Sequence, residues 1–213
     1  MNKYIDITVP VSSDLPHWPD APKVRFEHRL DLAQGDEATD SNLFMNIHTG
    51  THVDAPAHFI AGGKTVEALP LDILIGPVYV AQVPPQIQAI DDLTLNGLNI
   101  PENAMRVLLH TDNSRLWESS EFYPNFTAVT ADGAEWLVQR GIRLIGIDYL
   151  SIQRFADNPD THRILLGAEV IVIEGLNLSK VAAGWYELIC LPIKLQGLEG
   201  APARVLLKMR NSI

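Results

Sequence analysis

The sequence predicts an α/β fold in one domain, and three observations support it. Residues 131–140 carry apolar side chains at helical spacing, and an apolar strand follows directly at 142–148. A helix that leads into a buried strand is typical of α/β folds. The chain has 213 residues, of which 46% are hydrophobic, which is enough for one substantial core. No repeat, linker or low-complexity segment divides it, so we expect a single domain over residues 1–213.

The N-terminal part alternates between predicted strands and turn-rich loops. Residues 1–9 alternate polar and apolar side chains, as in a strand, and the proline-rich segment 10–22 is expected to be a loop. Residues 23–30 alternate again, which predicts a half-buried antiparallel strand with His28 exposed on its polar side. After a polar loop at 35–40, the chain leads into a histidine-rich segment.

The rest of the chain predicts two helices among apolar strands. The first helix, 131–140, begins after Thr130 as its N-cap and ends before Gly141. A shorter helix is expected at 161–166 with Thr161 as its cap. Further strands are expected at 73–83, 106–110, 170–176, 188–195 and 204–209, with a loop at 197–202.

The histidine-rich segment spans residues 48–59. Three of the chain's seven histidines and one aspartate lie at even positions within eleven residues of it: His48, His52, Asp54 and His58. Its β-branched residues favour an extended chain, and Pro56 would break a helix. In a strand, alternate residues share one face, so the first three side chains would point to the same side. We therefore expect them on a strand end, with His58 beyond the turn that Pro56 fixes.

Two imidazoles and a carboxylate on one side form a ligand set for zinc, manganese or iron. Such a set leaves a coordination position open for water or substrate, which distinguishes a catalytic metal site from a structural one. The alternative is that each histidine is an ordinary polar residue of the core or surface. The metal site is favoured because four ligand-type side chains share even positions and Gly50 allows a close backbone approach.

His162 and Glu174 are candidates for a second metal position. Glu174 follows four apolar residues, and burying it without a partner would be costly, whereas a cation would supply a partner. Taken alone, either residue is ordinary, because their spacing of twelve is no motif. A histidine with a carboxylate is nevertheless what a second metal ion would need.

Trp18 is a large aromatic residue held between Pro16 and Pro19 in an irregular segment. It either covers the core or forms the wall of a pocket for a planar substrate, and composition does not separate these two roles. Residues 61–64 form a turn after the histidine-rich segment, in the position that a lid would take. Asp148, at a strand end, is expected to be structural rather than to support a metal ligand.

Charge and cysteine usage exclude several classes of protein. A net charge of −10 argues against nucleic acid or an anionic membrane as partner, since both need a basic face. Cys190 is the single cysteine, so no intrachain disulfide is possible, and its apolar neighbours predict a buried thiol. The longest apolar run, 73–83, is too short to span a bilayer, and the N-terminus lacks the apolar block of a signal peptide. We therefore expect a cytoplasmic protein.

With these residues in hand, the sequence resembles the metal-dependent cyclase family, which includes bacterial kynurenine formamidases. The segment 48–59 carries the resemblance, and matching segments extend it to the end of the chain: Gly146-Ile147-Asp148 with Ser151, His162 with Leu165-Leu166, Glu174 to Leu178, Leu191-Pro192, and Gly200 to Arg204.

The resemblance implies a swivelling β/β/α fold with a mixed sheet, assembled as a homodimer or larger oligomer. It also implies hydrolysis of a small-molecule amide or lactam with one or two divalent metal ions, zinc first and manganese as the alternative. One zinc would bind His48, His52 and Asp54, with Asp54 as a bridge to a second zinc on His162 and Glu174. His58 would transfer protons, and Trp18 would contact the substrate.

The expected chemistry is hydrolysis of an amide by water that the metal activates. Bound metal lowers the pKa of water and polarises the carbonyl. His58 would accept the proton and return it to the departing nitrogen. An aryl formamide such as N-formylkynurenine is the most specific substrate, with an isatin-like lactam close behind. A metal-dependent binding protein without turnover is the third alternative, which His58 disfavours.

Overall fold

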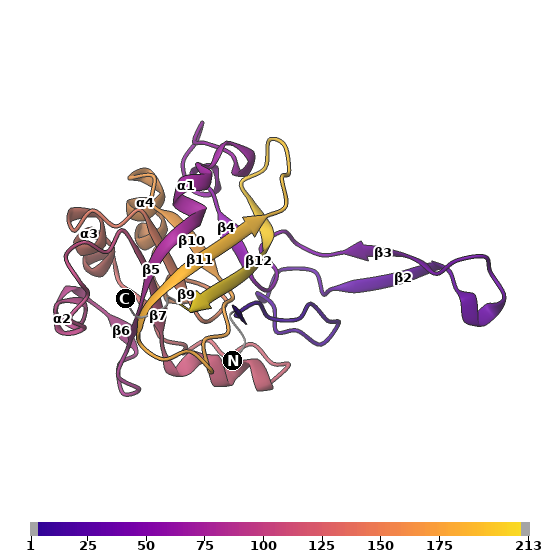
Figure 1. Ribbon diagram of the computed structural model, residues 1–213, viewed down its shortest axis with the longest axis horizontal. Helices are drawn as coiled ribbons and strands as arrows, with labels where there is room; N and C mark the ends of the chain where they lie inside the picture. Colours follow the sequence, from indigo (N-terminus) through magenta and orange to yellow (C-terminus); the bar gives the residue numbers. More distant parts are fainter. Residues whose placement is uncertain (1–3, 210–213) are drawn as a thin grey trace.

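The computed structural model describes residues 4–209, and a mixed sheet forms their centre (Figure 1). The eight strands of this sheet follow the order β1-β12-β11-β5-β7-β9-β10-β4, with a further pairing of β12 with β4. Because β4 pairs with β10 on one side and with β12 on the other, the sheet curls back on itself at this strand. In chain order the strands are β1 (Tyr4–Asp6), β4 (His52–Asp54), β5 (Ile75–Gln82), β7 (Arg106–His110), β9 (Leu144–Ile147), β10 (Ile171–Glu174), β11 (Gly184–Pro192) and β12 (Gly200–Met209).

The sheet combines a parallel half with an antiparallel half. Strands β5, β7, β9 and β10 are parallel, whereas β1, β4, β11 and β12 pair antiparallel with their neighbours. Short helices gather on one side of the parallel half in Figure 1. They are α2 (Asp92–Gly97), α3 (Ala131–Gln139) and α4 (Asp160–Gly167). This arrangement confirms the predicted α/β class with a mixed sheet and flanking helices.

Smaller elements complete the described chain. One turn of helix, α1 (Leu71–Leu74), precedes β5, and a short parallel pair joins β6 (Ala89–Ile90) to β8 (Ala128–Val129). The remaining helical segments are 3-10 turns: η1 (Leu32–Gln34), η2 (Pro56–His58), η3 (Val66–Ala68) and η4 (Asp112–Glu118). No helix among residues 4–209 is both long enough and apolar enough to cross a membrane.

Both faces of the sheet are buried, which explains the continuous apolar runs of its central strands. In β7, Val107 and Leu109 enter the core beneath α3, whereas Leu108 points into the core on the opposite face. Cys190 of β11 belongs to that second core and is fully buried, as predicted. Burial raises the pKa of its thiol, so the thiol stays protonated and unreactive.

Local signals predicted several element boundaries correctly. The strand at 106–110 is found at the predicted residues, and α3 begins after Thr130, whose hydroxyl accepts a hydrogen bond from the amide of Gly133. Gly141, at φ 77°, ends the turn after α3. The predicted first strand is observed from Tyr4, and its residues 1–3 lie outside the described chain.

Other predicted boundaries were wrong because long-range contacts decide them. The segment 73–83 begins as helix α1 and becomes a strand only at Ile75. Helix α4 begins one residue before Thr161, whose hydroxyl instead donates to the carbonyl of Val129. The predicted loop 197–202 ends at Gly200, because β12 starts there to pair with β4.

The predicted half-buried strand at 23–30 is the largest correction. It forms β2 (Arg25–Leu30), which pairs antiparallel with an unpredicted strand, β3 (Asp40–Phe44). The two strands extend away from the body of the molecule as a ribbon (Figure 1). Every residue of β2 is exposed, so its alternation of side chains does not reflect a core on one face.

A close contact between two glycines holds β10 against the segment that precedes β4. Gly175 has φ 72°, and a Cβ atom there would lie 1.9 Å from the carbonyl oxygen of Gly50. Thr51 adds a side-chain hydrogen bond of 2.5 Å to the carbonyl of Gly175. The backbones of two distant segments thus meet with no room for a side chain between them.

We expect Gly175→Ala to destabilise the fold strongly because it combines a left-handed backbone angle with a backbone clash. Gly197→Ala is the matched control, since Gly197 has φ 75° but open space around its Cβ position. The control should cost only about 1 kcal/mol, and Gly175→Ala several times more. Urea unfolding of both variants measures the difference. Equal losses of stability would show that the contact with Gly50 is not tight.

Candidate metal centre

The histidine-rich segment is a turn followed by a short strand. Strand β4 includes only His52 to Asp54, so the predicted strand position of His48 is wrong. Gly50, at φ 66°, bends the chain and turns His48 back toward the strand. Nδ1 of His48 lies 2.8 Å from Oδ1 of Asp54, and Nε2 of His52 lies 3.4 Å from the same oxygen. The three predicted ligands therefore do converge.

Strand pairing and a helix bring the two remaining predicted ligands to the same place. Glu174 of β10 is the register partner of His52 across the sheet, and its Oε2 lies 3.4 Å from Nε2 of that histidine. His162 lies in the first turn of α4, with Nε2 3.1 Å from Oε1 of Glu174 and 3.7 Å from Oδ2 of Asp54. The twelve residues from His162 to Glu174 contain most of α4, the connection after it and strand β10, which returns the chain to the same place.

The electrostatics of this cluster are those of a site that attracts cations. Burial opposes charge on His52, but attraction by the Asp54 and Glu174 carboxylates outweighs it and raises the pKa of His52 to about 10. Burial would raise the pKa of Asp54, yet the neighbouring His48 and His52 hold it well below its usual range. The pKa of Glu174 is also lowered, because His162 and His52 outweigh burial and repulsion by Asp54. Two buried carboxylates thus keep their negative charge and require positive charge between them.

Unsatisfied polar atoms show that the donor set fits a divalent metal. Nε2 of His48, Nε2 of His52 and Oδ2 of Asp54 are buried without a hydrogen-bond partner among the described residues. Nδ1 of His52 donates its proton to the carbonyl of Gly50 at 2.9 Å, so Nε2 is the ring nitrogen that a metal ion would bind in exchange for its proton. Such backbone support is usual for metal-binding histidines.

Two groups of ligand atoms are compact enough for an ion. Within each, the atoms lie within 4.8 Å of one another: His48, Asp54 and His58 in one group, and His52, Asp54 and Glu174 in the other. Asp54 belongs to both groups. The grouping differs from the predicted one, because His58 joins His48, His52 joins Glu174, and His162 belongs to neither group. Nitrogen and oxygen donors of this kind suit zinc, manganese and iron.

His58 lies at the end of the Pro56 turn, against the cluster. It ends the 3-10 turn η2, and its ring stacks on His48 with 4.0 Å between ring centroids. The next residue, Phe59, stacks on His162 at 4.4 Å. Burial lowers the pKa of His58 below its ordinary value, so the ring is neutral near pH 7 and can accept a proton.

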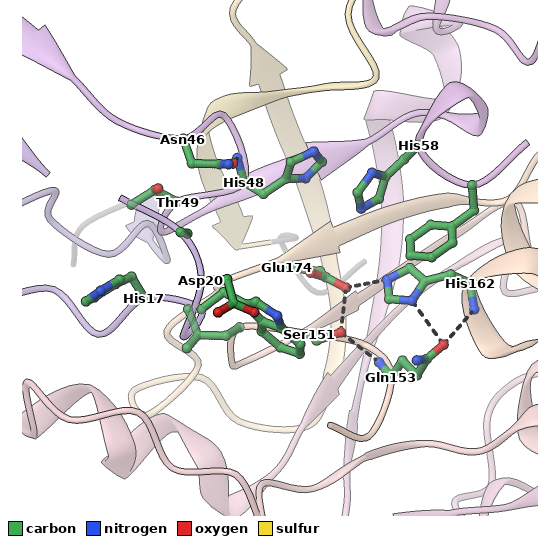
Figure 2. A pocket seen from close by; sticks show the side chains of 14 residues that line it. His17, Asp20, Asn46, His48, Thr49, His58, Ser151, Gln153, His162 and Glu174 are labelled. Carbon is green, nitrogen blue, oxygen red and sulfur yellow. Dashed lines mark hydrogen bonds and ion pairs between the residues drawn. The ribbon is translucent and has the colours of Figure 1, made fainter. Parts of the chain in front are cut away.

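A cavity of about 390 Å³ opens onto the cluster (Figure 2). Trp18 lines it, and the tryptophan ring makes edge contacts with Phe122 and Phe155 at 5.5 and 5.1 Å between centroids. The structure therefore places Trp18 in a pocket wall. Residues 61–64 do not line the cavity; Lys64 instead pairs with Glu169 at 2.7 Å. The proposed lid at 61–64 stays a prediction.

Sequence reasoning missed a support for His162. Oε1 of Gln153 lies 3.2 Å from Nδ1 of His162 (Figure 2). The amide of Ile152 donates a 2.7 Å hydrogen bond to Oε1 of Glu174. An amide oxygen at Nδ1 accepts the proton of that nitrogen, so Nε2 is the nitrogen that faces Glu174 and Asp54. Gln153 belongs to no local motif, so only the three-dimensional arrangement reveals it.

Asp148 has the structural role expected of it. Its carboxylate is buried and accepts hydrogen bonds from the hydroxyls of Thr111 and Ser114 and from the amide of Thr111. Ser114 in turn accepts a hydrogen bond from the amide of Leu178. Asp148 thus joins η4 to the end of β9.

Comparison with known families identifies the chain. The Cyclase family model matches residues 5–154, which is more than half of the sequence. The chain belongs to the Cyclase family. This finding confirms the resemblance based on the histidine-rich segment.

Full-length relatives in the Cyclase family are similar over almost the whole chain. Cyclase-like protein 1 of Arabidopsis thaliana is 37% identical over 216 residues, which cover 96% of this chain and 84% of the relative. The kynurenine formamidase of Bacillus cereus is 33% identical over 208 residues, or 97% and 98% of the two chains.

Solved structures of the Cyclase family fold superpose well. A protein described as a potential metal-dependent hydrolase with cyclase activity matches with a TM-score of 0.84 at 36% identity, covering 99% of both chains. Isatin hydrolase A from Labrenzia aggregata matches with a TM-score of 0.82 at 26% identity, covering 96% of this chain and 92% of that one. The whole described chain thus shares one fold with these proteins.

Proposed function

We propose that this protein is a metal-dependent hydrolase of carbon–nitrogen bonds other than peptide bonds, and that its substrate is an aryl formamide such as N-formylkynurenine. The observation that carries the proposal is the cluster of three imidazoles and two carboxylates, buried at the base of a cavity and with free ligand atoms. Bacterial kynurenine formamidase, a relative at 33% identity, supports the choice of substrate.

Five residues would hold one or two divalent ions, with zinc first and manganese as the alternative: His48, His52, Asp54, His162 and Glu174. When bound, such an ion polarises the substrate carbonyl and lowers the pKa of water. The buried carboxylates would keep the ligand histidines in position, as the 2.8 Å contact of His48 with Asp54 does. Gln153 would hold His162 in the tautomer that binds metal.

His58 would move the proton. Its neutral ring would accept a proton at nitrogen when water adds to the formyl carbon. It would then donate this proton to the aryl nitrogen as the carbon–nitrogen bond breaks, which yields formate and an aryl amine. The stacked ring of His48 limits the orientations that His58 can adopt.

Trp18 would select a planar substrate. Trp18 lines the cavity, its ring is held by edge contacts with Phe122 and Phe155, and it suits an aryl ring. A cavity of about 390 Å³ lies at the small end of the range for ligand pockets. An isatin-like lactam has a ring of the same type, and the match to isatin hydrolase A at 26% identity makes lactam hydrolysis the second candidate.

A substrate panel on metal-loaded enzyme tests the proposal. We expect kcat/KM for N-formylkynurenine to exceed that for isatin by at least about tenfold, a difference of roughly 1.4 kcal/mol in transition-state binding. Faster opening of isatin would favour the lactamase. Tight binding of both compounds without product, measured by mass spectrometry, would indicate a binding protein instead.

We predict that His58→Ala lowers kcat by about 10²- to 10⁴-fold, the usual contribution of a general acid–base group, and leaves the metal content unchanged. Elemental analysis and steady-state kinetics on the same preparation measure both effects. His28→Ala, which removes an exposed histidine from the ribbon, is the control and should keep full activity. Loss of metal from His58→Ala would make His58 a ligand rather than a proton carrier.

We also predict that Gln153→Leu weakens metal binding by about 10- to 100-fold, because Nδ1 of His162 loses its acceptor. Gln153→Glu keeps an acceptor oxygen at this place and should retain the affinity. Competition with a chromophoric chelator gives both dissociation constants. Unchanged affinity in Gln153→Leu would contradict the supporting role of this side chain.

A further inference from the structure

Asp20 is a charged residue of the cavity that the metal centre does not use. Its side chain lines the cavity but belongs to neither group of ligand atoms that could hold an ion (Figure 2). Within residues 4–209, no ion pair or hydrogen bond engages its carboxylate. The residue is exposed, and an aspartate in contact with water is negatively charged near pH 7. The cavity thus presents a negative charge with no partner in the described chain.

A tight turn fixes Asp20 close to Trp18. The amide of Ala21 donates a 2.9 Å hydrogen bond to the carbonyl of Trp18, which closes a β-turn with Pro19 and Asp20 at its centre. Proline is favoured at the first central position of such a turn because its ring fixes φ. Pro16, just before the turn, is buried and anchors the segment. The ends of a β-turn lie within about 7 Å of each other, so the turn presents an aromatic ring and a carboxylate side by side.

The rest of the cavity lining carries no permanent positive charge. Among the described residues that line it there is neither a lysine nor an arginine. Glu174 is the other acidic residue of the lining, and it belongs to the metal cluster. Asn46 offers an uncharged donor, because its Oδ1 accepts a 2.8 Å hydrogen bond from the amide of His48 and its Nδ2 is left to donate. A substrate ammonium group could therefore form an ion pair in this cavity, whereas a substrate carboxylate would find no lysine or arginine.

We propose that Asp20 selects aryl formamides that carry an ammonium group, and that it pairs with this group while the aryl ring lies against Trp18. The inference rests on the proposed function and defines its substrate class more closely. N-formylkynurenine belongs to this class, because its side chain ends in an amino acid. Isatin has no ammonium group, and the carboxylate that forms when its lactam ring opens is repelled by Asp20. Asp20 is thus a specificity-determining residue that acts away from the reacting bond.

The expected strength of the selection is that of an ion pair near the protein surface. Asp20 is exposed, and exposed ion pairs change an equilibrium only about two- to fivefold. Salt weakens such pairs, because the Debye length is about 3 Å at about 1 M ionic strength. Contact between the aryl ring and Trp18 has no comparable dependence on salt. The charge preference and the binding of the ring can therefore be measured separately.

Three aryl formamides that differ only at the end of one side chain test the proposal. Each has its formamide group next to a ketone on the ring, and the ketone side chain ends in an ammonium, a methyl or a carboxylate group. The full-length, metal-loaded protein is compared with Asp20→Asn, Asp20→Glu and Asp20→Lys, which remove, keep and reverse the charge. Asp14→Asn is the matched control, because Asp14 lies in the same loop, is exposed and does not line the cavity.

We expect Asp20→Asn to lower kcat/KM for the ammonium compound about two- to fivefold, mainly through KM, and to raise it for the carboxylate compound. The methyl compound should react as with the wild type. Asp20→Lys should favour the carboxylate compound over the ammonium compound. Asp20→Glu and Asp14→Asn should keep the wild-type ratios, and about 1 M sodium chloride should bring the ratios of the wild type toward those of Asp20→Asn.

Unchanged ratios among the three compounds in Asp20→Asn would overturn the proposal. The same change of ratios in Asp14→Asn would also overturn it, since the effect would then come from the net charge of the protein. An equal loss of kcat/KM for all three compounds in Asp20→Asn would show that Asp20 only supports the loop, and would overturn the proposal as well.

Binding measurements separate this inference from the proposed function. If the wild type hydrolyses none of the three compounds, the proposed function fails, and the charge selection is measured by calorimetric titration with the three corresponding aryl amines. Tighter binding of the ammonium compound to the wild type than to Asp20→Asn would support the selection. Equal binding to both proteins, or no binding to either, would overturn it.

Discussion

The structure depends on two carboxylates, Asp54 and Glu174, that are buried side by side among three imidazoles. Neither carboxylate is solvated, and the pKa values of both are lowered, so both are negatively charged in the fold. Charge buried in this way is stable only when opposite charge compensates it. Part of this compensation comes from His52, whose pKa is raised to about 10, but free nitrogen and oxygen atoms remain at the centre of the cluster. A divalent cation would replace the proton of His52 and take these atoms as ligands.

The fold brings the side chains of the cluster together from three elements, β4, β10 and α4. Strand β4 supplies two ligands, and it is held between β10, which supplies Glu174, and β12, which closes the sheet. The contact of Gly175 with Gly50 lets the backbones of the two segments approach closely, so that Glu174 lies 3.4 Å from His52. Helix α4 then places His162 above Glu174. The helices and the two cores fix the positions of these elements, and the aromatic wall with Trp18 limits what can reach them.

Features encoded in short stretches could be predicted from the sequence. Three local features are found where they were predicted. His52 and Asp54 lie two residues apart on one strand, Thr130 caps a helix, and residues 106–110 form an apolar strand. Features that depend on distant pairing were missed. The pairing of β12 with β4 extended a strand into a predicted loop, and Gln153 reaches His162 only through the packing of α4. The prediction of a half-buried strand at 23–30 was wrong because alternation of side chains does not reveal whether another element covers the apolar face.

We expect a divalent cation to balance the charge of the buried carboxylates Asp54 and Glu174. Elemental analysis of chelator-treated protein re-equilibrated with zinc or manganese, with thermal unfolding of the same samples, tests it most directly. We expect one or two tightly bound ions per chain, a melting temperature raised by metal, and loss of both effects in Asp54→Asn but not in Glu67→Gln, which alters a carboxylate outside the cluster. Protein that binds neither metal and unfolds at the same temperature with and without them would contradict the account.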